Sequence, residues 1–178
     1  PVIIVSPTGR FVVAHAGWRG VAGNIAVLSA QRLAQADGAC CPDQVRANLG
    51  GYNVYIGPHI HACHFEVGQD VADTFRSQFG ASCIEGQRHV SMLDALRTSL
   101  VAAGVDAARI CDAGICTQCN SQAYYSIAHR AARAAAMVPS RSERLDTMPF
   151  AQHYQNTLDE LSRVCASCGR NPRDVKVI

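Results

Sequence analysis

Apolar positions along the chain fall into two kinds of pattern, short continuous runs and stripes that recur every three to four residues. The continuous runs are bounded by glycine, proline and polar residues, which is typical of buried strands. They cover residues 2–5, 11–15, 52–56 and 109–112. A Ser-Pro-Thr-Gly turn at residues 6–9 separates the first two runs, so these strands are predicted to pair as a hairpin.

The stripes predict helices, because side chains at this spacing share one helical face. Helices are predicted at about residues 21–36, 67–79 and 91–103, and further helical patterns follow residues 126 and 150. Ser91 followed by Asp94 is typical of a helix start, and Gly38 and Gly104 are placed to end two helices. The Cys-Cys-Pro sequence at residues 40–42 is predicted to be a loop.

Strands and helices are intermixed along residues 1–138, which predicts an α/β or α+β fold with a mixed sheet. Residues 139–149 hold serine, arginine and two prolines without periodicity, which is the composition of a linker. An apolar helical stripe and a strand-like run follow the linker. They predict the beginning of a second domain, cut short, over residues 150–178.

The composition is that of a globular protein, with 48% hydrophobic and 17% charged residues. The net charge of +2 is too small to indicate nucleic acid or an acidic membrane as the partner. No apolar run reaches the ~20 residues of a membrane-spanning helix. Nine cysteines are interpreted as reduced thiols of a cytoplasmic protein, because disulfide-rich secreted domains are smaller and denser in cysteine. The chain opens at Pro1 directly in a strand-like run, so we expect its natural start to lie upstream.

The sequence His15-Ala-Gly-Trp-Arg-Gly20 lies between a predicted strand and a predicted helix. Its glycines allow a sharp turn and the close approach of a ligand. The imidazole of His15 can ligate a metal or carry a proton, and the guanidinium of Arg19 can hold an anion by two hydrogen bonds. A buried histidine, a core tryptophan and a simple turn explain the same pattern, so spacing alone leaves both interpretations open.

Residues 59–66 hold the densest group of potential ligands, with three histidines, Cys63 and Glu66. They lie between a strand and a helix, where α/β proteins expose functional loops. Cys63 could act as a nucleophile only if a base or cation lowers its pKa. Solvated loop histidines, and a Glu66 that favours the dipole of the next helix, are the structural alternatives.

Two Cys-x-x-Cys pairs, Cys116 with Cys119 and Cys165 with Cys168, suggest a four-cysteine zinc ribbon. Their separation is much longer than the ~15–20 residues of an ordinary ribbon, and the predicted linker intervenes. The second pair also lies on a helical stripe, where cysteine can serve as a core residue. The sequence therefore argues against a ribbon.

Three motifs, in this order, resemble the signature of one family. They are His15-Ala-Gly-Trp-Arg-Gly20, the run Ile56-Gly-Pro to Cys63 and Phe65-Glu-Val67, and Cys116-Thr117 with Tyr124-Tyr-Ser126. The family is that of the purine nucleoside phosphorylases long labelled polyphenol oxidase or laccase-domain proteins, also called peptidoglycan editing factors. The likeness covers about residues 1–138. It implies a layered α/β/β/α fold and a zinc-dependent enzyme that phosphorolyses adenosine, inosine, guanosine and methylthioadenosine and deaminates adenosine.

The resemblance also implies roles for single residues. Two histidines and a cysteine hold the family's zinc, and the histidine of the first motif corresponds to His15. The other two ligands belong to segments that would precede Pro1, so the resemblance implies an incomplete zinc site and an enzyme that is incomplete in this chain. Arg19 is our hypothetical holder of the phosphate nucleophile, and Cys63 matches a motif cysteine and is a candidate catalytic residue.

The chain departs from the family pattern in two places. His64 stands where a second cysteine is frequent. Residues 127–133 lack the family's paired arginines and its glycine-rich turn, so no ligand contact is carried over to that segment.

Other functions remain as alternatives. The family's older label implies a copper-dependent phenol oxidase, but no methionine lies near residues 59–66 in the sequence to be the weak axial ligand of a blue copper site. Residues 153–178 resemble the opening helix and strand of the pyridoxal-phosphate homeostasis proteins, which implies a fused carrier or regulator of that cofactor. Lys176 does not match the position of that family's cofactor lysine. A thiol hydrolase that uses Cys63 with a nearby histidine is the third alternative.

Overall fold

The computed structural model describes residues 1–124, and the account below concerns that part of the chain. The predicted linker at 139–149, the predicted domain start at 150–178 and the end of the third motif lie outside the described residues. These three expectations therefore stay predictions.

Four strands form the main sheet, in the order β2-β1-β3-β6. They are β1 (Val2–Val5), β2 (Phe11–Ala14), β3 (Asn53–Ile56) and β6 (Ile110–Asp112). β1 is antiparallel to both of its neighbours, whereas β3 and β6 are parallel. The predicted hairpin of the first two strands and the predicted mixed sheet are therefore confirmed.

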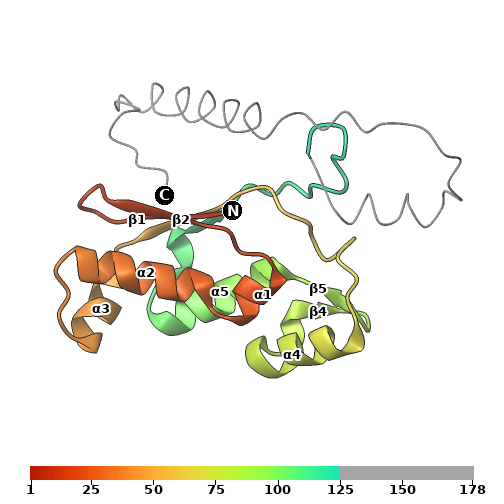
Figure 1. Cartoon of the computed structure of the whole chain (residues 1–178), viewed down its shortest axis with the longest axis horizontal. Coiled ribbons are helices and arrows are strands. Elements are labelled where there is room, and N and C mark those ends of the chain that lie inside the picture. Colours follow the sequence, from red (N-terminus) through yellow and green to blue (C-terminus); the bar gives the residue numbers. More distant parts are fainter. Residues whose placement is uncertain (125–178) are drawn as a thin grey trace, which may run out of the picture. The chain divides into compact units, whose positions relative to one another are not determined.

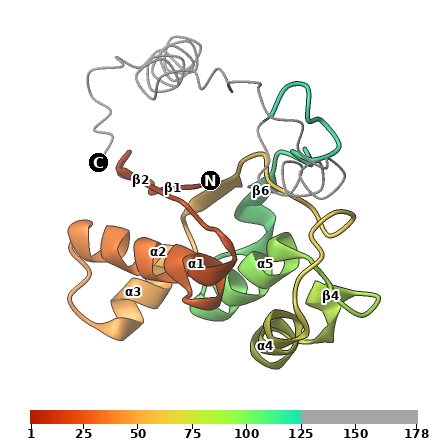
Figure 2. The ribbon, with the colours of Figure 1, turned by 45° about the vertical axis from the view of Figure 1, so that its right-hand side comes forward.

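Five helices accompany the sheet. They are α1 (Trp18–Ala22), α2 (Ile25–Ala36), α3 (Pro42–Leu49), α4 (Gln69–Phe79) and α5 (Met92–Ala103). Figures 1 and 2 show α1, α2, α3 and α5 gathered on one side of strands β1 and β2. No helix within residues 1–124 combines the length and the apolar character needed to span a membrane.

The structure differs from the sequence prediction at three places. The predicted helix at 21–36 is two helices, α1 and α2, because Asn24 adopts a left-handed conformation with φ of 56°. Residues 40–42 are not simply a loop, since Pro42 begins α3; proline suits the first helical position, where its missing N–H has no partner to lose. The hairpin of β4 (Ile84–Glu85) and β5 (His89–Val90) was not predicted, because two-residue strands are too short to show an alternating pattern.

The core lies between the helices and one face of the sheet. Val2, Ile4 and Val54 point into it and are buried, together with Phe75 of α4 and Leu100 of α5. Burying a side chain of this kind contributes about 1.5–3 kcal/mol, so this face provides most of the stability of the sheet.

The opposite face of the sheet is apolar but exposed. Ile3 pairs with Val13 on one side and with Tyr55 on the other, and 37%, 56% and 46% of these three residues are accessible. The described residues therefore form one helical layer on one main sheet. The second sheet of the expected α/β/β/α arrangement is not among them.

Gly104 ends α5 in a conformation that only glycine adopts easily, with φ of +117°. A Cβ atom there would lie 2.9 Å from Cγ of Arg46 and 3.0 Å from its carbonyl oxygen. The predicted start of the same helix is also confirmed, since the Ser91 hydroxyl accepts a hydrogen bond from the Asp94 backbone N–H at 3.2 Å.

We expect Gly104→Ala to lower the free energy of unfolding by about 2–4 kcal/mol, because it adds a clash with a backbone oxygen to the strain of a positive φ. Gly38→Ala is the matched control: its φ is +95°, but no atom lies within 4 Å of the added Cβ. Strain alone should cost that variant about 1–2 kcal/mol. Urea unfolding measures both, and equal losses would contradict a role for the Arg46 contact.

A buried carboxylate joins the first hairpin to α2 and β3. Asp37 accepts hydrogen bonds from the Tyr52 hydroxyl at 2.6 Å and from the Thr8 hydroxyl at 2.8 Å, and Arg10 lies 3.6 Å away. Burial acts to raise the pKa of Asp37, but the hydrogen bonds of Tyr52, Thr8 and Ser6 and the charge of Arg10 outweigh it and lower that pKa below its ordinary value. The charged form therefore stabilises the fold.

We expect Tyr52→Phe to lower the free energy of unfolding by about 1.5–3 kcal/mol at pH 7, because it removes a hydrogen bond to a buried charge. The pKa of Asp37 is lowered on folding, so its contribution is complete at neutral pH and is lost as the pH falls below about 4. The difference between wild type and variant in urea unfolding should shrink over that range. Tyr55→Phe, on the exposed sheet face, is the control and should change stability by less than about 0.5 kcal/mol. A Tyr52→Phe loss that is no larger than the control's would refute this role for the hydroxyl.

Candidate functional site

The three sequence motifs leave the sheet at the same edge. β1 is antiparallel to β2 and β3, and β3 is parallel to β6, so β2, β3 and β6 all run in one direction. The last residues of these three strands are Ala14, Ile56 and Asp112. Together with Val2, the first residue of β1, they form one row across the sheet. Residues 15–20, 57–66 and 113–119 follow directly from this row. Ligands of α/β proteins bind beyond the carboxyl ends of parallel strands, which makes this carboxyl edge the candidate site.

The first motif presents two exposed side chains. His15 follows β2 and Arg19 lies in the first turn of α1, and both are exposed. The guanidinium carbon of Arg19 lies 4.5 Å from the centre of the Trp18 ring, a cation–π contact that steadies the guanidinium. A Cβ at Gly17 would lie 3.2 Å from Nε2 of His15, so this glycine leaves room for the imidazole. The side chains that the sequence selected for chemistry are thus accessible.

His15 does not complete a metal site with the residues described. A zinc site of the expected kind needs three protein ligands. Within residues 1–124, His15 belongs to no group of three or more ligand side chains whose ligand atoms lie within 4.8 Å of one another. Its role as a zinc ligand therefore stays a prediction.

A different set of ligand side chains does come together, which we call the Cys/His cluster: Cys63, His64, Cys116 and Cys119. The sulfur of Cys63 lies 3.8 Å from that of Cys116 and 3.9 Å from that of Cys119. Nδ1 of His64 lies 3.2, 3.9 and 3.5 Å from the sulfurs of Cys63, Cys116 and Cys119. All three cysteines are free thiols, and only Cys116 is buried.

The parallel pairing of β3 and β6 brings the two halves of the cluster together. The pairing continues beyond the strands as a bridge between His59 and Cys116. The backbone N–H of His59 donates to the carbonyl of Ile115 at 3.2 Å, and that of Thr117 donates to the carbonyl of His59 at 3.0 Å. Two segments more than fifty residues apart are thereby fixed side by side.

Electrostatics shifts the pKa values of Cys116 and Cys63 in opposite directions. Burial acts to raise the pKa of Cys116, but backbone N–H groups of His61, Cys119 and Gln118 and the His64 side chain outweigh it and lower that pKa to about 6. Desolvation, together with the hydrogen bonds and charges of Cys116 and Cys119, raises the pKa of Cys63 to about 11. A nucleophilic Cys63 would need a lowered pKa. The electrostatics therefore gives the catalytic role predicted for Cys63 no support.

Two further histidines lie between the cluster and the sheet. Nδ1 of His59 lies 3.0 Å from the carbonyl oxygen of Gly57 and 3.7 Å from a carboxylate oxygen of Asp112. Its ring centre is 4.6 Å from that of His61. Burial lowers the pKa of His59, although Gly57 and Asp112 act to raise it, so a neutral imidazole is favoured. Nε2 of His61 is buried without a hydrogen-bond partner.

The structure changes one premise of the copper argument. Met92 is distant from residues 59–66 in the sequence, yet it lines a cavity of about 300 Å³ together with His59, His61 and Cys63. The missing methionine is therefore not a valid objection. However, His59, His61 and Cys63 do not come within ligand distance of a common ion in the described chain, so the two-histidine, one-cysteine set of a blue copper site is not assembled there.

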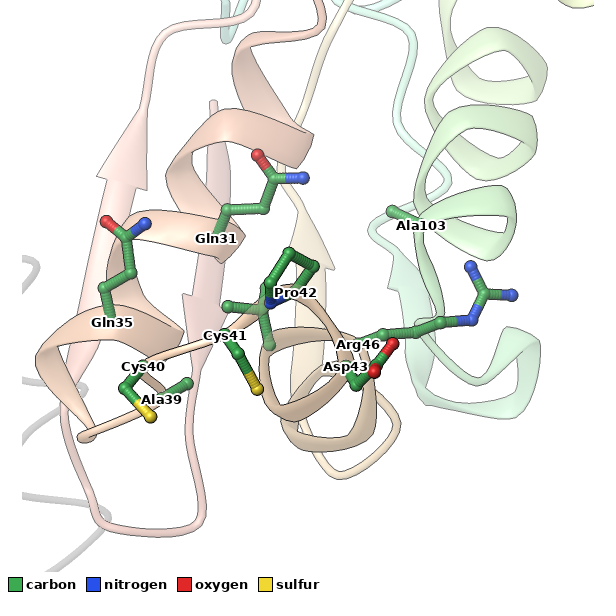
Figure 3. Close-up of a pocket in the computed structure, with 10 residues that line it drawn as sticks. Gln31, Gln35, Ala39, Cys40, Cys41, Pro42, Asp43, Arg46 and Ala103 are labelled. Carbon is green, nitrogen blue, oxygen red and sulfur yellow. The ribbon is translucent and has the colours of Figure 1, made fainter.

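A larger cavity lies away from the carboxyl edge. It measures about 490 Å³ and lies between α2, α3 and the end of α5, with Gln31, Cys41 and Arg46 on its wall (Figure 3). None of the site residues predicted from the sequence lines it. The volume of a cavity alone therefore does not locate the chemistry of this fold.

Sequence reasoning missed the Cys/His cluster as a unit. It treated Cys63 as a nucleophile and compared the Cys116–Cys119 pair with Cys165 and Cys168, which lie outside the described residues. The available signal was that the Cys63-His64 pair and the Cys116–Cys119 pair each follow a strand of one parallel pair.

Comparisons with known proteins identify the family. Residues 1–138 match the family model described as multi-copper polyphenol oxidoreductase laccase. Adenosine deaminase RL5, from an unknown prokaryotic organism, is 34% identical over 134 residues, which cover 71% of this chain and 48% of that protein. Purine nucleoside phosphorylase YlmD of Geobacillus stearothermophilus is 31% identical over 136 residues, which cover 71% of this chain and 46% of that protein.

Solved structures show the same relationship. The crystal structure of Bacillus licheniformis hypothetical protein YfiH aligns with a TM-score of 0.61 and 28% identity, over 74% of this chain and 49% of that one. YlmD of Geobacillus stearothermophilus aligns with a TM-score of 0.59 and 32% identity, over 75% and 48%. The chain spans about half the length of these relatives. Its sequence match over residues 1–138 and its fold together show that the chain belongs to the multi-copper polyphenol oxidoreductase laccase family.

Proposed function

We propose that the protein is an enzyme of purine nucleoside chemistry, which cleaves nucleosides with inorganic phosphate and deaminates adenosine. The observation that carries the proposal is the arrival of three family motifs at one carboxyl edge. Relatives that are 34% and 31% identical to this chain are named adenosine deaminase and purine nucleoside phosphorylase. Free thiols throughout the described residues support a reducing, cytoplasmic location.

Arg19 is proposed to hold the phosphate. Its guanidinium is exposed, is held over the Trp18 ring, and forms no ion pair within the described part of the chain. A planar guanidinium can donate two parallel hydrogen bonds to a phosphate, which orients this nucleophile as well as binding it.

His15 is proposed as one zinc ligand, with the remaining ligands outside the described residues. A zinc ion held by His15 and those ligands would supply the Lewis-acid chemistry that activates water for deamination. His61 is proposed as a proton carrier at the same edge, because its buried Nε2 is without a hydrogen-bond partner and its ring contacts that of His59.

Copper-dependent oxidation of phenols is the second candidate, because the family model carries that description. The two candidate functions differ in what they require: phenol oxidation needs bound copper and oxygen, whereas nucleoside cleavage needs phosphate.

We expect the natural protein, including the zinc-ligand segments that the resemblance places before Pro1, to release free purine from adenosine or inosine only when phosphate is present, and to release ammonia from adenosine without phosphate. Chromatography of bases and nucleosides measures both reactions. A phenol substrate with and without added copper is the control. Phenol oxidation that requires copper, with no turnover of any nucleoside, would reject the proposal in favour of the second candidate.

We expect Arg19→Ala to raise the KM for phosphate by about 10- to 100-fold, because a hydrogen-bonded charge contact of about 1.5–3 kcal/mol is removed. The KM for the nucleoside should stay close to that of wild type, which separates loss of phosphate binding from a damaged site. Arg32→Ala is the matched control, since Arg32 is also exposed but lies on α2 beside Gln35. A phosphate KM that stays the same in Arg19→Ala would remove this role.

A further inference from the structure

We propose that Cys63, His64, Cys116 and Cys119 bind a zinc ion in a closed, structural site that is separate from the site of His15. The proposal does not depend on the nucleoside chemistry. It concerns four side chains that the fold brings together from two distant segments.

The distances within the cluster are those of a tetrahedron around zinc. With Zn–S bonds of ~2.3 Å and a Zn–N bond of ~2.0 Å, tetrahedral geometry places sulfur atoms ~3.8 Å apart and sulfur and nitrogen ~3.5 Å apart. The two sulfur pairs measured from Cys63 are 3.8 and 3.9 Å. The three sulfur–nitrogen distances to His64 are 3.2, 3.9 and 3.5 Å. These five distances are thus close to those of tetrahedral zinc, and all four ligand atoms lie within 4.8 Å of one another.

The kind and number of ligands favour a structural role. Three cysteines and one histidine are a common structural zinc set, and four protein ligands leave no open position for water or substrate. Thiolates are soft ligands that exclude magnesium and calcium, which prefer oxygen. Zinc binding replaces the thiol protons, which are released to the solvent, and changes no oxidation state.

The backbone around Cys116 supports a thiolate that is held by a metal. The backbone N–H of His61 lies 3.5 Å from the sulfur of Cys116. The Cys116–Cys119 segment is folded into a turn by Asn120, whose backbone N–H and side-chain amide both donate to the carbonyl of Cys116, at 3.1 and 2.9 Å. Two cysteines separated by two residues in such a turn can bind one ion together.

A disulfide explains the cluster less well. A bond between two sulfurs needs a distance of ~2.05 Å, and it would use only two of the four side chains. Cys63 is almost equally far from Cys116 and Cys119, which favours no single pair. A disulfide would leave the imidazole of His64 unused, whereas a metal would bind it together with the three sulfurs.

The metal would join residues 57–66 to residues 113–119 just beyond the sheet. His59 and His61 lie between the cluster and the sheet. The backbone of His59 forms hydrogen bonds with Ile115 and Thr117, and the backbone N–H of His61 contacts the sulfur of Cys116. The zinc ion is thus a structural support for the loop that presents these histidines at the carboxyl edge.

Zinc titration of the reduced, metal-free protein tests the proposal, with a competing chelator to measure affinity. We expect wild type to bind one zinc at this site, and Cys119→Ser and His64→Ala to bind it at least about 100-fold more weakly. Cys119 and His64 are exposed, so these variants should fold, which circular dichroism checks. His64→Cys should bind zinc as wild type does, because a fourth thiolate replaces the imidazole.

Two further variants isolate the site. Cys111→Ser removes an exposed thiol on β6 that is not part of the cluster, and it should bind zinc like wild type. His15→Ala should also keep this zinc, whatever happens to nucleoside turnover, so the two proposals can fail independently. Cobalt bound in place of zinc should give thiolate-to-metal absorption in wild type that is strongly reduced in Cys119→Ser.

Four results would overturn the proposal. The first is a reduced protein that binds no zinc, and the second is a zinc affinity unchanged by Cys119→Ser and His64→Ala. The third is a disulfide from Cys63 to Cys116 or Cys119 in protein purified with reductant. The fourth is copper(I), rather than zinc, bound to these residues in protein isolated from cells.

Discussion

The site depends on one constraint, the direction of the strands around β1. Because β1 lies antiparallel between β2 and β3, and β3 pairs in parallel with β6, three strands end at the same edge. Each of these strands is short, and each is followed at once by a motif that carries histidine, cysteine or arginine. The buried face of the sheet holds this register, since a slip of one residue would exchange Val2 and Ile4 with the exposed Ile3.

Local patterns were sufficient to predict most elements of the fold. The apolar runs located the four main strands, and the Ser91 cap and Gly104 located the ends of α5. The break at Asn24 was not predicted, because asparagine is tolerated in a helix. Its left-handed conformation goes with long-range packing, in which α2 lies against β1 and β2 while α1 contacts α4 and α5. α3 was missed because a short helix that begins at Pro42 has the same local signal as a turn.

The candidate site was predictable in its residues but not in their grouping. His15, Arg19 and Cys63 were selected from their motifs, and the structure places all three at or near the carboxyl edge. The contact of Cys63 with Cys116 and Cys119 requires the parallel pairing of β3 with β6, which is a long-range feature that no local window contains. The burial of Met92 beside His59 follows in the same way from the packing of α5.

The span between the two halves of the Cys/His cluster affects how the protein folds. Cys63 and Cys116 are 53 residues apart, and the chain between them includes α4, α5 and the small hairpin. A cross-link over such a loop removes roughly 4 kcal/mol of chain entropy from the unfolded state. The parallel pairing of β3 with β6 raises the contact order. Folding is therefore slowed, because the entropy of closing this long loop is lost before the contacts between the two strands form. If zinc binds the Cys/His cluster, the zinc concentration would then set the fraction of molecules in which β6 is paired with β3.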